Sequence, residues 1–254
     1  MAEGGNLAIL EYGADSIIHP GQSESGDKYI VKETITGALI GAIDGLGHGT
    51  EAAIASDLAV KIIDDHADES VITIARLCHE SLNRTRGVVM ALASINSTED
   101  TLTWLSIGNV EGTFIRADAH VVPGHENIFT RPGVVGYRLP SLFASVISIS
   151  KNDMVILSTD GIRNDYAQKI LSDIHHASEY FPQMTEAQIG TTTHEVVEQS
   201  ETWIQKPGIE NQKLETRDIL SPKNMASYIG THFSKGSDDA LVVVARYKGK
   251  PAAG

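Results

Sequence analysis

The chain has 254 residues, of which 41% are hydrophobic and 21% are charged, and it carries a net charge of −13. This composition is ordinary for a globular domain, and the acidic balance opposes nonspecific binding to nucleic acid or to an anionic membrane. A single cysteine, Cys78, excludes an internal disulfide. The first residues lack the pattern of a secretory leader, and no apolar run approaches the roughly 20 residues that span a bilayer, so we expect a cytoplasmic protein.

The first third of the chain reads as strands followed by two helices. We predict strands at residues 6–18, 28–34 and 38–43, the last ending at Asp44-Gly45. Apolar residues then recur at helical spacing over residues 51–66. Ser70 is a suitable N-cap for a second helix, which we expect Gly87 to end.

The remainder of the chain favours hairpins. The predicted strands lie at residues 88–95, 101–107, 112–116, 145–150, 154–159 and 240–246. Residues 165–235 are polar and mostly helical in pattern, with Ser221-Pro222 as a helix start. Two helices between runs of hairpin strands favour an α+β layered fold over a doubly wound parallel sheet. We expect one domain over residues 1–254, with an extended, mostly helical segment at about 168–234.

Acidic residues stand beside four of the predicted strands. They are Asp27, Asp44, Asp160 and the pair Asp238-Asp239. Each one alone reads as a turn residue, because Asp is common in turns and unfavourable inside strands. Four such positions together suit a hard cation such as magnesium or manganese, which prefers carboxylate ligands. No pair of histidines has the spacing of a recognisable zinc site.

Four short motifs carry a resemblance to a known family. The string Ala42-Ile43-Asp44-Gly45-Leu46-Gly47-His48-Gly49 resembles the Asp-Gly-x-Gly-His-Gly motif of bacterial PPM-type phosphatases of the SpoIIE group. Ser25-Gly26-Asp27, Ser158-Thr159-Asp160-Gly161 and Asp238-Asp239-Ala240 are similar to the other acidic motifs of that family. The resemblance covers roughly residues 7–165 and 235–247. It implies an αββα sandwich, with two antiparallel sheets flanked by helices, and a metal-dependent serine/threonine phosphatase activity.

The resemblance also implies roles for these residues. Asp44 would bridge two divalent cations, Mn²⁺ or Mg²⁺, with help from the Gly45 carbonyl. Asp160 and Asp238 would complete one cation site, and Asp27 would hold the other cation. The paired cations would lower the pKa of a water molecule and neutralise the charge that builds on the phosphoryl oxygens. Gly26 is a departure, because relatives outside this bacterial group have Glu there, next to the Asp27 position.

Residues outside the acidic motifs point toward a substrate. Thr85-Arg86-Gly87, residues 106–110 and residues 132–140 resemble the branch of the family that acts on stressosomes. The implied substrate is a phosphorylated STAS-domain protein of a stressosome, with a phosphorylated anti-anti-sigma factor as the alternative. Arg131, Arg138 and Arg163 are candidates to steer an acidic surface toward the cations, or are ordinary solvated arginines.

Three other interpretations of the sequence compete with a metal-dependent phosphatase. Cys78 and Arg84 have the spacing of a cysteine-dependent phosphatase, but Cys78 falls on the apolar face of a helix that has already begun. The glycines of residues 45–49 followed by Asp64-Asp65 imitate a dinucleotide fingerprint, but no strand follows to carry the acid. A noncatalytic pseudophosphatase that binds a partner stays open. His48 and Asn109 are either neighbours of the ligands or plain turn residues.

Overall fold

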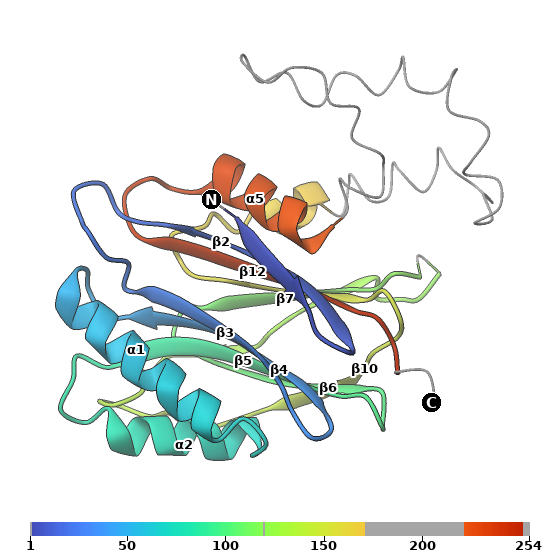
Figure 1. The fold of residues 1–254 in the computed structure, drawn as a ribbon, viewed down its shortest axis with the longest axis horizontal. Coiled ribbons are helices and arrows are strands. Elements are labelled where there is room, and N and C mark those ends of the chain that lie inside the picture. Colours follow the sequence, from blue (N-terminus) through green and yellow to red (C-terminus); the bar gives the residue numbers. More distant parts are fainter. Residues whose placement is uncertain (1, 119, 171–220, 251–254) are drawn as a thin grey trace, which may run out of the picture.

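The structure, a computed structural model, describes residues 2–118, 120–170 and 221–250 (Figure 1). Two sheets stack face to face, and helices cover both outer faces. The first sheet has the spatial order β1 (Glu3–Asn6), β2 (Leu10–Ile17), β12 (Ala240–Tyr247), β11 (Met154–Ser158), β7 (Glu111–Ile115) and β8 (His125–Asn127). The second has the order β10 (Ser145–Ser148), β6 (Thr101–Ile107), β5 (Val88–Asn96), β4 (Gly37–Gly45) and β3 (Asp27–Glu33). A short β9 (Thr130–Arg131) pairs in parallel with β6, whereas the other strand pairs are antiparallel.

Among the described residues, α1 (Thr50–Asp65), α2 (Val71–Ser81) and α5 (Pro222–Phe233) make up most of the outer layers. Helices α1 and α2 lie on the second sheet, and α5 lies across β2 and β12 of the first (Figure 1). The buried face of α1 is rich in alanine, which lets this helix approach β3 and β4 closely. Ser70 and Ser221 cap α2 and α5 as predicted, because each hydroxyl accepts a hydrogen bond from the N–H three residues later.

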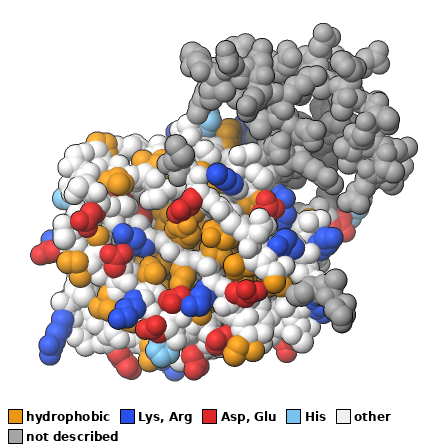
Figure 2. All heavy atoms as spheres, viewed as in Figure 1, with side chains coloured by type: hydrophobic (Ala, Val, Ile, Leu, Met, Phe, Trp, Pro, Cys, Tyr) orange, Lys and Arg blue, Asp and Glu red, His pale blue; other side chains and the backbone are white. Residues whose placement is uncertain are grey.

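Apolar side chains fill all three interfaces between these layers. The inner faces of the sheets meet around residues such as Ile40, Phe114 and Val243. A second cluster lies under α1 and α2, and a third lies under α5. On the face shown in Figure 2, acidic and basic side chains are interspersed around a central group of hydrophobic ones. No helix in the described ranges is long and apolar enough to cross a membrane.

Two predicted boundaries are wrong, and two short strands are not predicted at all. The predicted strand at residues 6–18 is interrupted, because the chain reverses where the Leu7 N–H donates to the Leu10 carbonyl at 2.8 Å; Asn6 ends β1, which pairs back on β2. Helix α2 ends at Ser81, well before Gly87, since the Leu82 carbonyl is taken by the Thr85 N–H and hydroxyl in a turn. β8 and β9, of 3 and 2 residues, are too short to leave a periodic signal.

The predicted helical segment at about 168–234 lies mostly outside the described residues. Its described ends are helical, at residues 166–170 and in α5. The turn at residues 151–153 crosses from β10 in one sheet to β11 in the other, with Asn152 at a φ of 74°. The layers therefore follow the predicted helix–sheet–sheet–helix order.

Candidate metal centre

The predicted aspartates meet at one end of the sandwich, where α1 begins (at the left of Figure 1). Asp44 is the second-last residue of β4, and the antiparallel register places it opposite Asp27, the first residue of β3. In the facing sheet, Asp160 follows β11 and Asp238 precedes β12, its antiparallel neighbour. The two sheets therefore bring together residues that are up to 211 positions apart in the chain (238 minus 27).

A pocket of about 320 Å³ opens between these strand ends. Its wall contains three of the predicted ligands, Asp44, Asp160 and Asp238, and its described lining includes no lysine or arginine. The other residues that line it are Leu46, Gly47, His48, Val89, Asn109 and Val134. The pocket is therefore acidic, and a phosphate group needs additional positive charge to bind there.

Burial and mutual repulsion make these carboxylates hard to ionise. Burial, with the charges of Asp27, Asp160, Asp238 and Asp239, raises the pKa of Asp44 to about 8. Burial and three of the same carboxylates raise the pKa of Asp27 to about 7, although a hydrogen bond from Thr159 opposes the rise. The pKa of Asp160 is also raised, by burial and then by Asp238, against the opposing charge of Lys235.

Two residues fix the position of Asp27. The Thr159 hydroxyl donates to Asp27 Oδ2 at 2.6 Å, and the hydroxyl oxygen Oγ1 of Thr159 in turn accepts the N–H of Leu241 at 2.9 Å. Asp239, only 4% exposed, accepts the N–H of His19 at 2.7 Å and that of Gly26 at 2.6 Å. Asp239 thus fastens the segment that leads into β3, whereas its neighbour Asp238 is exposed beside the pocket.

The glycines between β4 and α1 are required by space and backbone conformation. A Cβ on Gly45 would collide with the Ala52 carbonyl oxygen in the first turn of α1. Gly47 has a φ of 89°, and the guanidinium of Arg86 lies against the position that its Cβ would take. Arg86 also pairs with Glu51 at 2.5 Å, so this cation lies at the rim of the pocket rather than in its wall.

Both residues that the sequence left ambiguous line the pocket. Asn109 Nδ2 donates to Asp160 Oδ2 at 2.6 Å, which orients one predicted ligand. His48 is exposed in the wall, and its ring stacks on that of His19 at 6.0 Å between centroids. These contacts favour the reading of His48 and Asn109 as neighbours of the ligands.

The predicted ligands offer the kind of atoms that a hard divalent cation prefers, namely carboxylate oxygens with the Gly45 backbone beside them. Asp44 is half-buried, and the described pocket wall holds no lysine or arginine to balance its charge, so the site favours binding of a cation. Across the described ranges, no three histidine, cysteine, aspartate or glutamate side chains already stand as a finished ligand set. The carboxylates are therefore gathered around the pocket but not fully converged on one point.

The alternative chemistries have no comparable site. Cys78 is fully buried in α2 under the second sheet, and burial raises the pKa of its thiol to about 12, so it is a core residue as predicted. After α1 the chain enters α2 rather than a strand, and so no dinucleotide-binding βαβ unit forms around Asp64-Asp65.

No family model matches the chain. A curated relative, the phosphoserine phosphatase RsbX of Bacillus subtilis (strain 168), is 26% identical over 144 residues, covering 56% of this chain and 69% of the relative. The sequence similarity thus includes a phosphatase of the predicted kind.

Solved structures agree on the fold. A chain from the bacterial stressosome, a modular system adapted to control secondary messenger signaling, matches with a TM-score of 0.68 and 23% identity, over 93% of this chain and 99% of that one. RsbX in complex with magnesium matches with a TM-score of 0.65 and 16% identity, over 97% and 100%. The catalytic domain of the serine/threonine phosphatase PstP, in complex with 2 manganese ions, matches with a TM-score of 0.54 and 15% identity, over 94% and 98%.

These findings confirm the predicted class. The protein has the αββα fold of the PPM (PP2C) phosphatases. Its resemblance to RsbX extends from the sequence to the fold, and it bears out the predicted enzyme class, a phosphoprotein phosphatase.

Several residues of the site were not predicted as such from the sequence. In the sequence Thr159 stands out only as part of a motif, since its bond to Asp27 joins residues 132 positions apart. Val89 and Val134 line the pocket as ordinary apolar residues without a distinguishing pattern. The stretches 85–87 and 132–140, singled out by resemblance, were the one signal that pointed toward Arg86 and Val134.

Proposed function

We propose that this protein removes phosphate from phosphoserine or phosphothreonine on a STAS-domain protein of a stressosome, using two divalent cations, Mn²⁺ or Mg²⁺. The observation that carries the proposal is the gathering of four aspartates from four strand ends around one acidic pocket. The similarity to RsbX, a phosphoserine phosphatase, and the match to a chain from the bacterial stressosome support this substrate class. A single buried cysteine supports the cytoplasm as the compartment.

Each predicted ligand has a proposed role. Asp44 would contact both cations, together with the Gly45 carbonyl, because it lies opposite Asp27 in the sheet and shares the pocket wall with Asp160 and Asp238. When bound, the cations would supply positive charge for the phosphoryl oxygens and activate a water molecule for attack. Asp27, Asp44, Asp160 and Asp238 would thus be the metal ligands, of which Asp44, Asp160 and Asp238 bear most directly on catalysis.

The remaining polar groups would shape the pocket for the phosphorylated residue. Asn109 holds Asp160 in place through its 2.6 Å hydrogen bond, and Thr159 holds Asp27. Asp239 fixes the segment before β3 by accepting two backbone N–H groups. These bonds position the ligands without occupying the pocket, so they reduce the ordering that must accompany binding.

The test is turnover of a phosphorylated STAS-domain protein with and without manganese. Asp44→Asn should lower turnover on the order of 10³-fold, because several kcal/mol of charge stabilisation depend on this residue. Asp160→Asn and Asp238→Asn should also be severe. Asp239→Asn should be milder, since an amide keeps one acceptor for the His19 or Gly26 N–H.

The matched control is Asp57→Asn, an exposed carboxylate on α1 that pairs with Lys28 at 3.2 Å. The Asp57→Asn variant should hydrolyse the phosphoprotein at the wild-type rate, and its activity should stop when a chelator is added. Full turnover by Asp44→Asn in metal-free buffer would refute the proposal. Preference for a phosphorylated anti-anti-sigma factor would reassign the substrate, and manganese binding without turnover of either protein would favour a pseudophosphatase.

A further inference from the structure

A second hollow lies next to the acidic pocket and has a different character. It has a volume of about 280 Å³ and is lined by Pro132, Gly133, Val134, Tyr137 and Arg138. Val134 lines both the hollow and the acidic pocket, so the two are adjacent. The hollow is therefore within reach of residues that flank one bound in the acidic pocket.

The loop that forms the hollow is held rigidly. Val134 and Arg138 exchange two backbone hydrogen bonds of 2.9 and 2.8 Å, which close a tight turn around Tyr137. Val135 bonds to Val88 at the start of β5, and the Gly136 N–H donates to His79 on α2 at 2.9 Å. Tyr137 is nevertheless 83% exposed. A large aromatic ring held in the open on a fixed turn is suited to bind a partner at low entropic cost.

Arg131 is clamped at the edge of the same surface. Its guanidinium lies 5.2 Å from the ring centre of Phe129 and 5.9 Å from that of Phe143, and the two rings meet edge to face. Phe129 and Phe143 are 58% and 50% exposed. Arg131 Nε is buried and has no hydrogen-bond partner among the described residues. The guanidinium of Arg131 is thus oriented by aromatic rings and makes no ion pair with a described residue.

Strand β9, which contains Arg131, also brings this residue near the acidic pocket. Its carbonyl accepts the N–H of Gly108 at 2.8 Å, and the next residue, Asn109, lines the acidic pocket and holds Asp160. Arg138 is exposed and makes no ion pair with any residue that the structure describes. By contrast, Arg163 pairs with Asp165 at 3.3 Å, donates to the His232 carbonyl and stacks on Phe233. Of the three arginines that the sequence suggested for steering, Arg163 is thus engaged within the fold.

We propose that the surface of Phe129, Arg131, Tyr137, Arg138 and Phe143 binds the acidic segment that flanks the phosphorylated residue of the substrate protein. This inference rests on the proposed function. Two guanidinium groups without a described carboxylate partner, on a chain of net charge −13, are complementary to acidic side chains rather than to basic ones. The aromatic rings and the apolar hollow provide contact area for the backbone and for apolar side chains of the same segment.

The test compares two synthetic phosphoserine peptides, one with acidic residues on both sides of the phosphoserine and one with glutamines in their place. With manganese, the wild-type protein should hydrolyse the acidic peptide with a kcat/KM about tenfold higher, a factor that one charge-assisted hydrogen bond can supply. The Arg131→Gln, Arg138→Gln double variant should lose this preference through KM. Hydrolysis of a small aryl phosphate should change less than about twofold, because that substrate does not reach the hollow.

Two controls keep the outcome decisive. Arg76→Gln removes an exposed arginine on α2 and should keep the preference. Arg138→Gln alone changes an exposed side chain, so it tests the surface even if the double variant folds poorly. An unchanged preference in the variants, or none in the wild type, would overturn the docking surface.

Peptide binding, measured by fluorescence anisotropy, separates this inference from the proposed function. If no substrate is hydrolysed but the acidic peptide binds the wild-type protein about tenfold more tightly than the glutamine peptide, and the double variant loses that difference, the surface stands and the phosphatase activity fails.

Discussion

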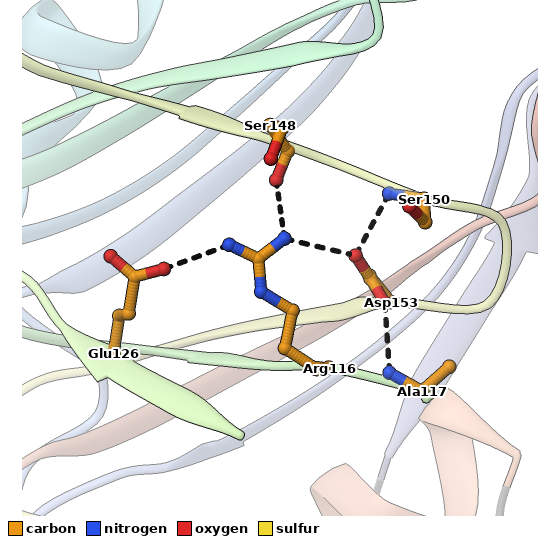
Figure 3. A network of polar contacts seen from close by, with 6 residues as sticks. All are labelled: Arg116, Ala117, Glu126, Ser148, Ser150 and Asp153. Atoms are coloured by element: carbon orange, nitrogen blue, oxygen red, sulfur yellow. Dashed lines mark hydrogen bonds and ion pairs between the residues drawn. The ribbon is translucent and has the colours of Figure 1, made fainter. Parts of the chain in front are cut away.

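Among the buried aspartates of this fold, those at the turn between the sheets and those at the candidate metal centre differ in how their charge is balanced. Asp153, 1% exposed, accepts the N–H groups of Ala117 and Ser150 at 2.8 Å each, and it lies 3.7 Å from the guanidinium of Arg116 (Figure 3). Arg116 also pairs with Glu126 at 2.8 Å. The charge of Asp153 is therefore balanced inside the fold, at the turn that joins the two sheets.

The candidate metal centre lacks this balance. Asp44 and Asp27 have other carboxylates as their nearest charges, and the pKa values of both are raised, to about 8 and about 7. No lysine or arginine lies in the described wall of their pocket. Burial of a carboxylate alone therefore does not identify a metal site. A carboxylate that is buried and balanced holds the structure together, whereas a cluster that is buried and unbalanced is available for a positively charged ligand.

The largest expected effect on stability is at the balanced site. Asp153→Ala should lower the free energy of unfolding by about 3 kcal/mol, because it leaves two N–H groups and part of the charge of Arg116 without a partner. Turnover per folded molecule should stay normal. Urea unfolding followed by circular dichroism measures the loss. Asp44→Ala is the matched counterpart and should show the reverse, with little turnover and no loss of metal-free stability. Equal destabilisation by both variants would break the comparison.

The pH dependence of the metal-free protein should be smaller and opposite to the usual behaviour of carboxylates. The folded-state pKa values of Asp44 and Asp27 lie above the unfolded value, so the folded protein binds more protons than the unfolded chain between about pH 4 and about pH 8. Stability should therefore fall as pH rises through this window, on the order of 2 kcal/mol between about pH 5 and about pH 8.

The same unfolding experiment in a chelator at several pH values measures this slope, and Asp44→Asn should flatten it. A metal-free stability that rises over this window, or a slope that Asp44→Asn leaves intact, would mean that the carboxylates are already balanced.

The smallest expected effect is at Cys78. Cys78→Ser should keep near-normal turnover and change stability by about 1 kcal/mol, because the side chain is buried among apolar residues and its described hydrogen bond is a weak one to the Ala59 carbonyl, at 4.0 Å. Steady-state hydrolysis of the phosphoprotein and of an aryl phosphate is the measurement. Lost turnover in a folded variant, with phosphocysteine trapped in the wild type, would move the chemistry from the aspartates to the thiol.

Much of the unbalanced site could be predicted from the sequence because its residues stand next to strong elements. Asp160 and Asp238 flank the apolar strands β11 and β12, and Asp44 ends the apolar run of β4. The hairpin of β3 and β4 then places Asp27 opposite Asp44. Local pattern singled out these positions, since each aspartate stands at the border of a clear strand signal, whereas their individual roles as metal ligands were implied only by the family resemblance.

The rest of the molecule depends on contacts between distant segments. Arg116 and Asp153 are 37 positions apart (153 minus 116), and neither interrupts a pattern that would single it out. The clamp of Arg131 requires β9, whose 2 residues pair in parallel with β6. Asp239 stands in the sequence only as the neighbour of Asp238, but its two backbone hydrogen bonds reach residues more than 210 positions away. Such partners follow from tertiary packing rather than from periodicity.

The unbalanced aspartates should hold divalent cations, which calorimetric titration of manganese into the wild-type protein, Asp57→Asn and Asp44→Asn at about pH 7.5 can show. Manganese should bind the first two alike, with release of protons as the carboxylates of raised pKa ionise, and Asp44→Asn should lose most of the affinity and of the proton release. Equal manganese affinity in the wild-type protein and Asp44→Asn, or no binding to the wild-type protein, would contradict this prediction.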